Sequence, residues 1–178
     1  LYLNLQETGF DYDYQYDNTV SFGEMLSTTL ISAYLNECGI RNELIDARDY
    51  IVTDHGFRSA NPEWDDCRLR IEKLKSNESV MYITQGFIAS SVSPKTTTTL
   101  GREGSDFSAA IFANCLDAEE LTIWKDVDGL RNADPKRFAD TKKISHLSYF
   151  EAIELAFYGA SVIHPKTLKP LQNKNIPL

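Results

Sequence analysis

The sequence predicts an α/β domain with a largely parallel sheet, and a regular alternation of two patterns predicts it. Short apolar runs typical of buried strands occur at Ser79–Thr84 and Glu120–Lys125. Longer segments with apolar residues at helical spacing alternate with them, at Ser21–Cys38, Ser105–Leu116 and Ser148–Tyr158. Such alternation is typical of parallel sheets, because each helix returns the chain to the edge from which the next strand starts.

Bulk composition restricts the class of protein. The chain has 178 residues, of which 42% are hydrophobic and 25% charged, values that fit one soluble globular domain. A net charge of −8 argues against nucleic-acid binding, which needs a basic surface. No apolar run reaches the ~18 residues of a membrane span. The three cysteines are widely spaced, without metal-ligand spacing, which favours reduced thiols, a cytoplasmic protein and no bound metal.

The N-terminal residues give the first structural expectations. Tyrosines alternate with aspartates within residues 1–20, and we interpret this stretch as an edge strand or loop that is mobile or partner-dependent. The first helix is expected to begin at Ser21, with Glu24 three residues later completing a capping box. Gly39 supplies the left-handed residue that commonly ends a helix.

The remaining elements follow from turn and periodicity signals. A short strand is expected near Glu43–Asp46, and a helix from Pro62 to Leu74. Residues 88–99 predict a hairpin whose turn is Ser93–Lys95, and Pro165 opens a final helical turn or two.

The segment Leu100–Phe107 is the first candidate site. It follows a predicted strand and precedes a predicted helix, the position at which α/β sheets bind ligands. Two glycines allow close approach of the backbone, Arg102 can hold a carboxylate through two hydrogen bonds, and Asp106 can hold an ammonium group. The structural alternative is a plain glycine turn with Ser105 or Asp106 as the N-cap of the helix.

Two further segments carry charged groups. Lys125, Arg131 and Lys136 are cations close together after a predicted strand and can face the phosphates of a nucleotide, although the residues alone favour a solvated charged loop. Gly23 next to Glu24 can direct that carboxylate into a cleft, which competes with the capping role. The sequence has no hydrolase triad spacing and neither of the glycine-rich nucleotide fingerprints.

Taken in order, short segments of the chain resemble those of the aspartokinases, within the amino-acid kinase family. Each segment alone is a weak signal, whereas their order and spacing from about residue 20 to the end are specific. The matching segments are Ser21–Glu24, Thr84–Ile88, Thr98–Phe107, Ile123–Gly129, Asp134–Lys136, Leu147–Ala152 and Tyr158–Thr167.

The resemblance implies a three-layer α/β/α sandwich with a mainly parallel sheet. It also implies ATP- and Mg²⁺-dependent phosphorylation of the L-aspartate side-chain carboxylate to 4-phospho-L-aspartate, on the route to lysine, threonine and methionine, in a cytoplasmic homo-oligomer. The residues implied to hold aspartate are Glu24, Arg102, Ser105 and Asp106. Those implied to border the nucleotide are Lys125, Asp126, Arg131, Lys136 and Ser161.

The chain also departs from the family pattern. It lacks the Lys-Phe-Gly-Gly segment whose lysine meets the ATP phosphates, and it lacks regulatory ACT domains. We therefore expect residues 1–178 to be a partial catalytic domain, truncated at the N-terminus and inactive alone, with no assigned catalytic residue. The alternatives are a family member with another acidic substrate, or a non-catalytic ligand-binding module.

Single substitutions add to these departures. Lys125 stands where threonine is common, and Ser161 where a lysine is usual, so positive charge is expected to have moved within the phosphate site. Glu103 stands where glycine is common. It places a negative charge beside the anion site and is expected to disfavour a positive φ there.

Overall fold

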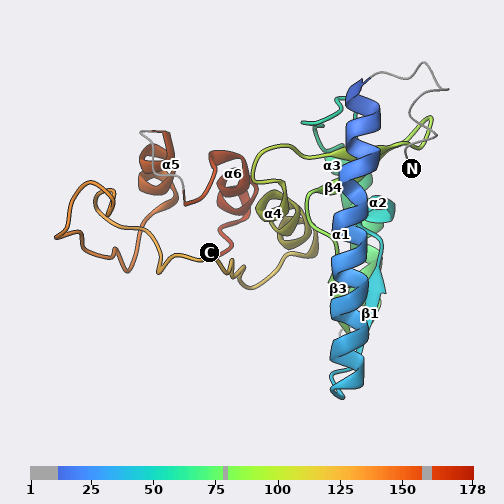
Figure 1. Ribbon diagram of the computed structural model, residues 1–178, viewed down its shortest axis with the longest axis horizontal. Helices are drawn as coiled ribbons and strands as arrows, with labels where there is room; N and C mark the ends of the chain where they lie inside the picture. Colours follow the sequence, from blue (N-terminus) through green and yellow to red (C-terminus); the bar gives the residue numbers. More distant parts are fainter. Residues whose placement is uncertain (1–11, 78–79, 158–161) are drawn as a thin grey trace.

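The computed structural model describes residues 12–77, 80–157 and 162–178. Its first element is α1 (Tyr12–Glu37), a 26-residue helix that packs against the strands (Figure 1). Beyond the strands, further helices extend the molecule sideways, so the described part of the chain is elongated.

The strands form two small sheets. β1 (Asn42–Ile45) pairs with β3 (Met81–Thr84) in parallel. β4 (Ile88–Ser91) pairs with β2 (Val52–Thr53) in parallel and with β5 (Thr97–Thr99) in antiparallel. Two of the three pairings are therefore parallel, and the antiparallel one is the hairpin that the sequence predicts.

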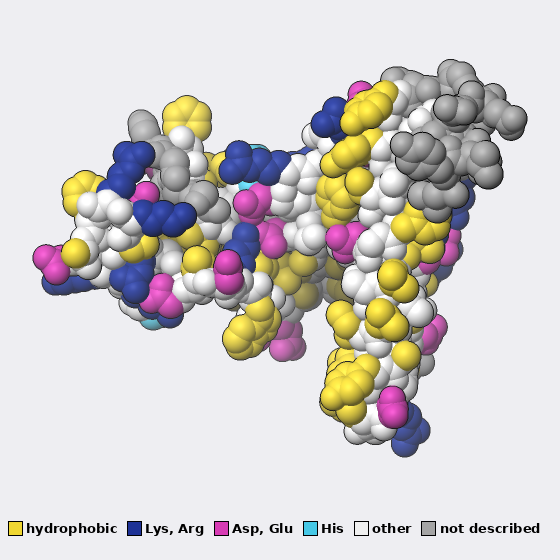
Figure 2. Space-filling model, in the orientation of Figure 1, with side chains coloured by type: hydrophobic (Ala, Val, Ile, Leu, Met, Phe, Trp, Pro, Cys, Tyr) yellow, Lys and Arg dark blue, Asp and Glu magenta, His cyan; other side chains and the backbone are white. Residues whose placement is uncertain are grey.

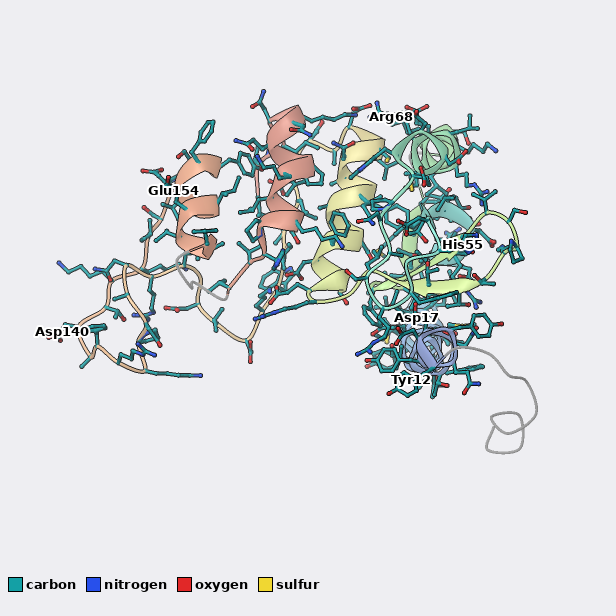
Figure 3. The ribbon with its side chains drawn as sticks, turned by 90° about the horizontal axis from the view of Figure 1, so that it is seen from above. Tyr12, Asp17, His55, Arg68, Asp140 and Glu154 are labelled. Atoms are coloured by element: carbon teal, nitrogen blue, oxygen red, sulfur yellow. The ribbon has the colours of Figure 1, made fainter. Side chains whose placement is uncertain are left out.

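Helices cover and extend these sheets. They are α2 (Ala47–Tyr50), α3 (Trp64–Ile71), which continues as the 3₁₀ helix η1 (Glu72–Asn77), α4 (Gly104–Leu116), α5 (Tyr149–Phe157) and α6 (Pro165–Lys174). Figures 1 and 3 show α4, α6 and α5 side by side, in agreement with the contacts between α4 and α6 and between α5 and α6.

The hydrophobic core surrounds α4. Phe107 and Ile111 on one face of this helix pack in a buried cluster with Ile51 and Val52 near β2 and with Ile71 of α3. Ala110 and Ala113 on another face pack against Leu171 of α6 and against Ile176. Because α4 is buried on two sides, its position is fixed by packing. The end of the segment that precedes α4 is therefore held in place as well.

The structure corrects three expectations for α1. Residues 12–20 are its first turns rather than an edge strand or loop, and residues 1–11 lie outside the described residues. Ser21 is in the helix interior, where its hydroxyl donates to the Asn18 carbonyl at 2.7 Å, so Ser21 and Glu24 form no capping box. The alternation of tyrosine and aspartate has a period of two, which hid the helix.

The buried face of α1 is polar. Asp17, Ser21, Thr28 and Ser32 are its buried residues, and they recur at the spacing of one helix face. The apolar residues that predict this helix lie largely in solvent. Leu26, Leu30 and Tyr34 are each more than half exposed, and hydrophobic side chains line the length of the helix in Figure 2. The apolar spacing therefore predicts the helix but does not identify its buried face.

The predicted strand Glu120–Lys125 is irregular in the structure. The Leu121 N–H donates to the Pro177 carbonyl at 2.8 Å, but no strand continues this contact among the described residues. Trp124 is 91% exposed, as expected for a segment without a neighbouring strand to pack against. An apolar run forms a strand only where a partner satisfies its backbone groups.

Within the described ranges, no helix combines the length and apolar character needed to cross a membrane. Cys67 and Cys115 are buried free thiols, and Cys38 is an exposed one. Burial raises the pKa of Cys67 to about 12, so this thiol is chemically inert near neutral pH.

Asp117, which follows α4, predicts a loss of stability in acid. Its carboxylate contacts Lys174 of α6 and Lys75 of η1, the latter at 2.7 Å. Hydrogen bonds from Lys174 and then Lys75 lower its pKa to about 2. A folded-state pKa below the usual value means that the ion pairs stabilise the protein fully above pH ~4 and are lost as pH falls toward 2.

Melting temperatures of wild type and Asp117→Asn should therefore differ at pH 7 and converge near pH 2. A difference that is constant over this range would contradict the assignment.

Candidate functional site

Two buried apolar residues fix the segment Leu100–Phe107. Leu100 and Phe107 both lie in the core cluster beside α4. Between them, Gly101 has φ +77°, and α4 begins at Gly104. The polar residues of the segment are turned away from the core as a result, and Arg102 and Ser105 are exposed.

The loop after β3 packs directly on the start of α4. A Cβ at Gly86 would lie 2.9 Å from Ser105 Cβ, so only glycine fits this approach. The Phe87 N–H donates to Ser108 Oγ at 2.9 Å, and that hydroxyl donates to the Gly104 carbonyl at 2.9 Å. The two glycine-containing segments, Thr84–Ile88 and Leu100–Phe107, thus form one surface.

Helix α1 joins the same surface through Gln85. The buried side chain of Gln85 donates to Thr28 Oγ1 of α1 at 3.0 Å and accepts from the Ala47 N–H at 2.8 Å. Glu24 lies one turn before Thr28, on the polar side of α1, and is half-buried. Glu24 therefore lies one turn from the residue of α1 that contacts Gln85, next to the buried polar face of the helix.

Two carboxylates at the start of α4 share one cation. Lys125 Nζ lies 2.9 Å from Glu103 Oε2 and 2.7 Å from Asp106 Oδ2. Burial opposes ionisation of Glu103, but the hydrogen bond and charge of Lys125 outweigh it and lower the pKa of Glu103. Burial likewise opposes the charge of Lys125, whose pKa is nevertheless raised by Asp106 and Glu103.

Glu103 adopts a conformation that the sequence does not predict. It has φ +56° and ψ +30°, the left-handed region, although a residue with a side chain is disfavoured there. The expectation that Glu103 disfavours a positive φ is therefore wrong for this position. The ion pair with Lys125 helps to offset the backbone cost, which is about 1–2 kcal/mol for a residue with a Cβ.

The remaining nucleotide-side residues lie on an irregular segment between α4 and α5. Arg131 binds Asp128 through two hydrogen bonds and also donates to Thr141, so it stabilises its own loop. Asp126 and Lys136 are exposed. Ser161 lies outside the described residues. The structure thus joins Lys125, but not Arg131, to the residues predicted to hold the substrate.

A cavity of about 530 Å³ opens beside Lys125. Lys125, Val127 and Leu130 line it from the irregular segment, and Tyr149 of α5 and Leu168 of α6 line it from the helices. In the described part of the chain, no three histidine, cysteine or acidic side chains are arranged to hold a metal ion.

The structure also assigns roles to residues that sequence reasoning missed. Asp17 of α1 is fully buried and binds β5, and Figure 3 places it between α1 and the strands. Lys166 of α6 donates to the Leu100 carbonyl at 3.1 Å, with its Nζ 4.6 Å from the centre of the Phe107 ring. Burial lowers the pKa of Lys166. The His164–Thr167 motif indicated the place of this lysine but not its contact.

Comparison with known proteins gives a consistent result. The model of the amino acid kinase family matches residues 2–178. The chain is 38% identical over 164 residues to the maize bifunctional aspartokinase/homoserine dehydrogenase 2 and 37% identical over 164 residues to the lysine-sensitive aspartokinase 3 of Escherichia coli. Those alignments cover 91% of this chain, but only 18% and 36% of the respective relatives.

Solved structures agree. The crystal structure of E. coli aspartokinase III in complex with aspartate and ADP matches with a TM-score of 0.86 and 36% identity. The match covers 92% of this chain and 37% of that one. It confirms the α/β fold class that the sequence predicts.

Proposed function

The chain belongs to the amino acid kinase family, and from this premise we propose that it forms the amino-acid-binding part of an aspartate kinase. The reaction would transfer the γ-phosphoryl group of ATP to the side-chain carboxylate of L-aspartate, giving 4-phospho-L-aspartate and ADP. The chain spans about a third or less of the relatives it matches, so this activity belongs to the proposal.

The observation that carries the proposal is the charge pattern at the start of α4. Arg102 is exposed and makes no ion pair among the described residues, so its guanidinium is available for a carboxylate. Asp106 lies one helical turn later with its carboxylate on an ammonium group, that of Lys125. A cation and an ammonium-binding carboxylate at this spacing suit the two charged groups of an α-amino acid.

The proposed phosphoryl transfer requires mainly that the protein position the two reacting groups. A substrate carboxylate is already a nucleophile at neutral pH, so the reaction needs no general base. The protein must hold this group in line with the phosphoryl group and neutralise the charge that is transferred. We propose that ATP binds with Mg²⁺, which shields its phosphates, and that Lys125 and Lys136 border them.

Arg102→Ala is expected to weaken L-aspartate binding. The loss of charge-assisted hydrogen bonds to the α-carboxylate costs about 1.5–3 kcal/mol, which corresponds to a roughly 10- to 150-fold higher Kd. Isothermal titration calorimetry with L-aspartate measures it. Arg68→Ala removes the same side chain from an exposed site on α3 (Figure 3) and should leave the Kd unchanged.

The outcomes of this titration separate the candidate functions. An unchanged Kd for Arg102→Ala would exclude the pocket, and tighter binding of another acidic metabolite would favour a different substrate within the family. Binding is the appropriate readout for these residues, because the chain spans only about a third or less of the relatives it matches. Homo-oligomer formation and a cytoplasmic location remain predictions.

A further inference from the structure

Lys125 covers the carboxylate that the proposed substrate needs. Its ammonium lies 2.7 Å from Asp106 Oδ2, and this oxygen is buried. The amino group of an amino-acid substrate would therefore compete with the ammonium of Lys125 for this carboxylate.

The environment of Lys125 makes such a replacement feasible. The side chains of Lys125, Glu103 and Asp106 are 24%, 20% and 15% exposed, so the cluster lies at the edge of solvent rather than in the core. Lysine carries its charge on a flexible four-carbon stem, which can redirect the ammonium without movement of the backbone. Glu103 and Asp106 would remain as two carboxylates able to hold an incoming ammonium.

The same lysine, proposed above to border the nucleotide phosphates, also faces a cavity. Lys125 lines the cavity of about 530 Å³ beside α5 and α6 as well as contacting α4. Phosphate groups in this region would offer its ammonium an alternative anionic partner. The Lys125 side chain thus lies between the two proposed ligands. Its ammonium can pair either with the carboxylates of Glu103 and Asp106 or with the nucleotide phosphates.

We propose that Lys125 is a switch residue that couples the two sites. Without nucleotide it neutralises Asp106 and Glu103 and competes with the substrate ammonium. With nucleotide it turns to the phosphates and exposes Asp106, so that nucleotide raises the affinity for L-aspartate. By linkage, L-aspartate raises the affinity for nucleotide by the same factor. This inference rests on the proposed function.

Calorimetric titration of L-aspartate into the protein, with and without saturating ADP and Mg²⁺, tests the coupling. We expect the Kd for L-aspartate to fall ~10-fold when nucleotide is bound, within the usual range of such couplings. Succinate has both carboxylates but no ammonium group, and its Kd should not fall. An equal gain for succinate would overturn the inference, because it would place the coupling away from Asp106.

Variants of the lysine give the second test. In Lys125→Met the Kd for L-aspartate should be the same with and without ADP, and close to that of the nucleotide-bound wild type. Lys142→Met removes the same charge from an exposed position on the irregular segment and should keep the coupling. Coupling that persists in Lys125→Met overturns the switch and leaves the proposed function standing. Failure of wild type to bind L-aspartate under either condition overturns the proposed function, and the switch with it.

Discussion

Asp17→Ala is expected to lower the free energy of unfolding by about 2–5 kcal/mol. The fully buried Asp17 carboxylate accepts three hydrogen bonds, from the Thr99 N–H at 2.9 Å, the Thr99 hydroxyl at 2.8 Å and the Arg58 N–H at 2.9 Å. Alanine leaves both buried donors of Thr99 without an acceptor, and each unsatisfied buried group costs about 1–3 kcal/mol. Urea unfolding followed by circular dichroism measures the loss.

Two variants separate the contributions to this effect. Asp13→Ala removes an exposed aspartate from the same helix, and its surface ion pair with Arg58 is worth about 0–1 kcal/mol. Asp17→Asn keeps the shape of the side chain and one acceptor oxygen, so it should cost less than Asp17→Ala. If Asp17→Ala cost no more than Asp13→Ala, the buried hydrogen bonds would not be what fixes α1 to the strands.

The role of Asp17 extends to the proposed site. It ties α1 to Thr99, the residue immediately before Leu100, across a sequence separation of 82 residues. The same helix carries Glu24 and contacts Gln85 through Thr28. The position of Glu24 relative to the start of α4 therefore depends on a carboxylate that is not among the proposed binding residues.

Sequence reasoning succeeds where apolar spacing and burial coincide. The helix Gly104–Leu116 was predictable because its apolar residues enter the core, and the hairpin was predictable from its turn residues. The strand Met81–Thr84 was predicted as a buried strand, but its residues are exposed or half-buried. Sequence reasoning fails for the buried face of α1, because that face is polar and is stabilised by hydrogen bonds to residues distant in sequence. Apolar periodicity contains no signal for such contacts.

For the candidate site, the sequence indicates candidate residues but not the contacts between them. Residue types and order select Arg102, Asp106 and Lys125 as candidates, since each lies in a short motif of defined spacing, and their roles stay predictions. The direct contact between Asp106 and Lys125 was not predictable, because the two residues come from different segments and were expected in different subsites. Only the three-dimensional structure shows that one cation serves both carboxylates.

Gly101→Ala is expected to destabilise the protein by about 2–4 kcal/mol, through two separable costs. Gly101 has φ +77°, and an added Cβ would lie 2.9 Å from the Arg58 carbonyl oxygen and 3.0 Å from Ser59 Oγ. The left-handed backbone costs a residue with a side chain about 1–2 kcal/mol, partly offset by about 0.4–1 kcal/mol from the stiffer unfolded chain. Overpacking against a backbone oxygen adds about 1–3 kcal/mol.

Gly39 provides the matched control for this substitution. It also has a positive φ, +83°, but no atom lies within 4 Å of an added Cβ. Gly39→Ala therefore carries only the backbone cost, and the difference between the two variants in urea unfolding isolates the steric term. Equal losses of unfolding free energy would mean that the loop containing Arg58 and Ser59 moves to accommodate the new methyl group. A larger loss at Gly101 means that the loop is rigid, and because Arg102 follows directly, the same variant should also weaken L-aspartate binding.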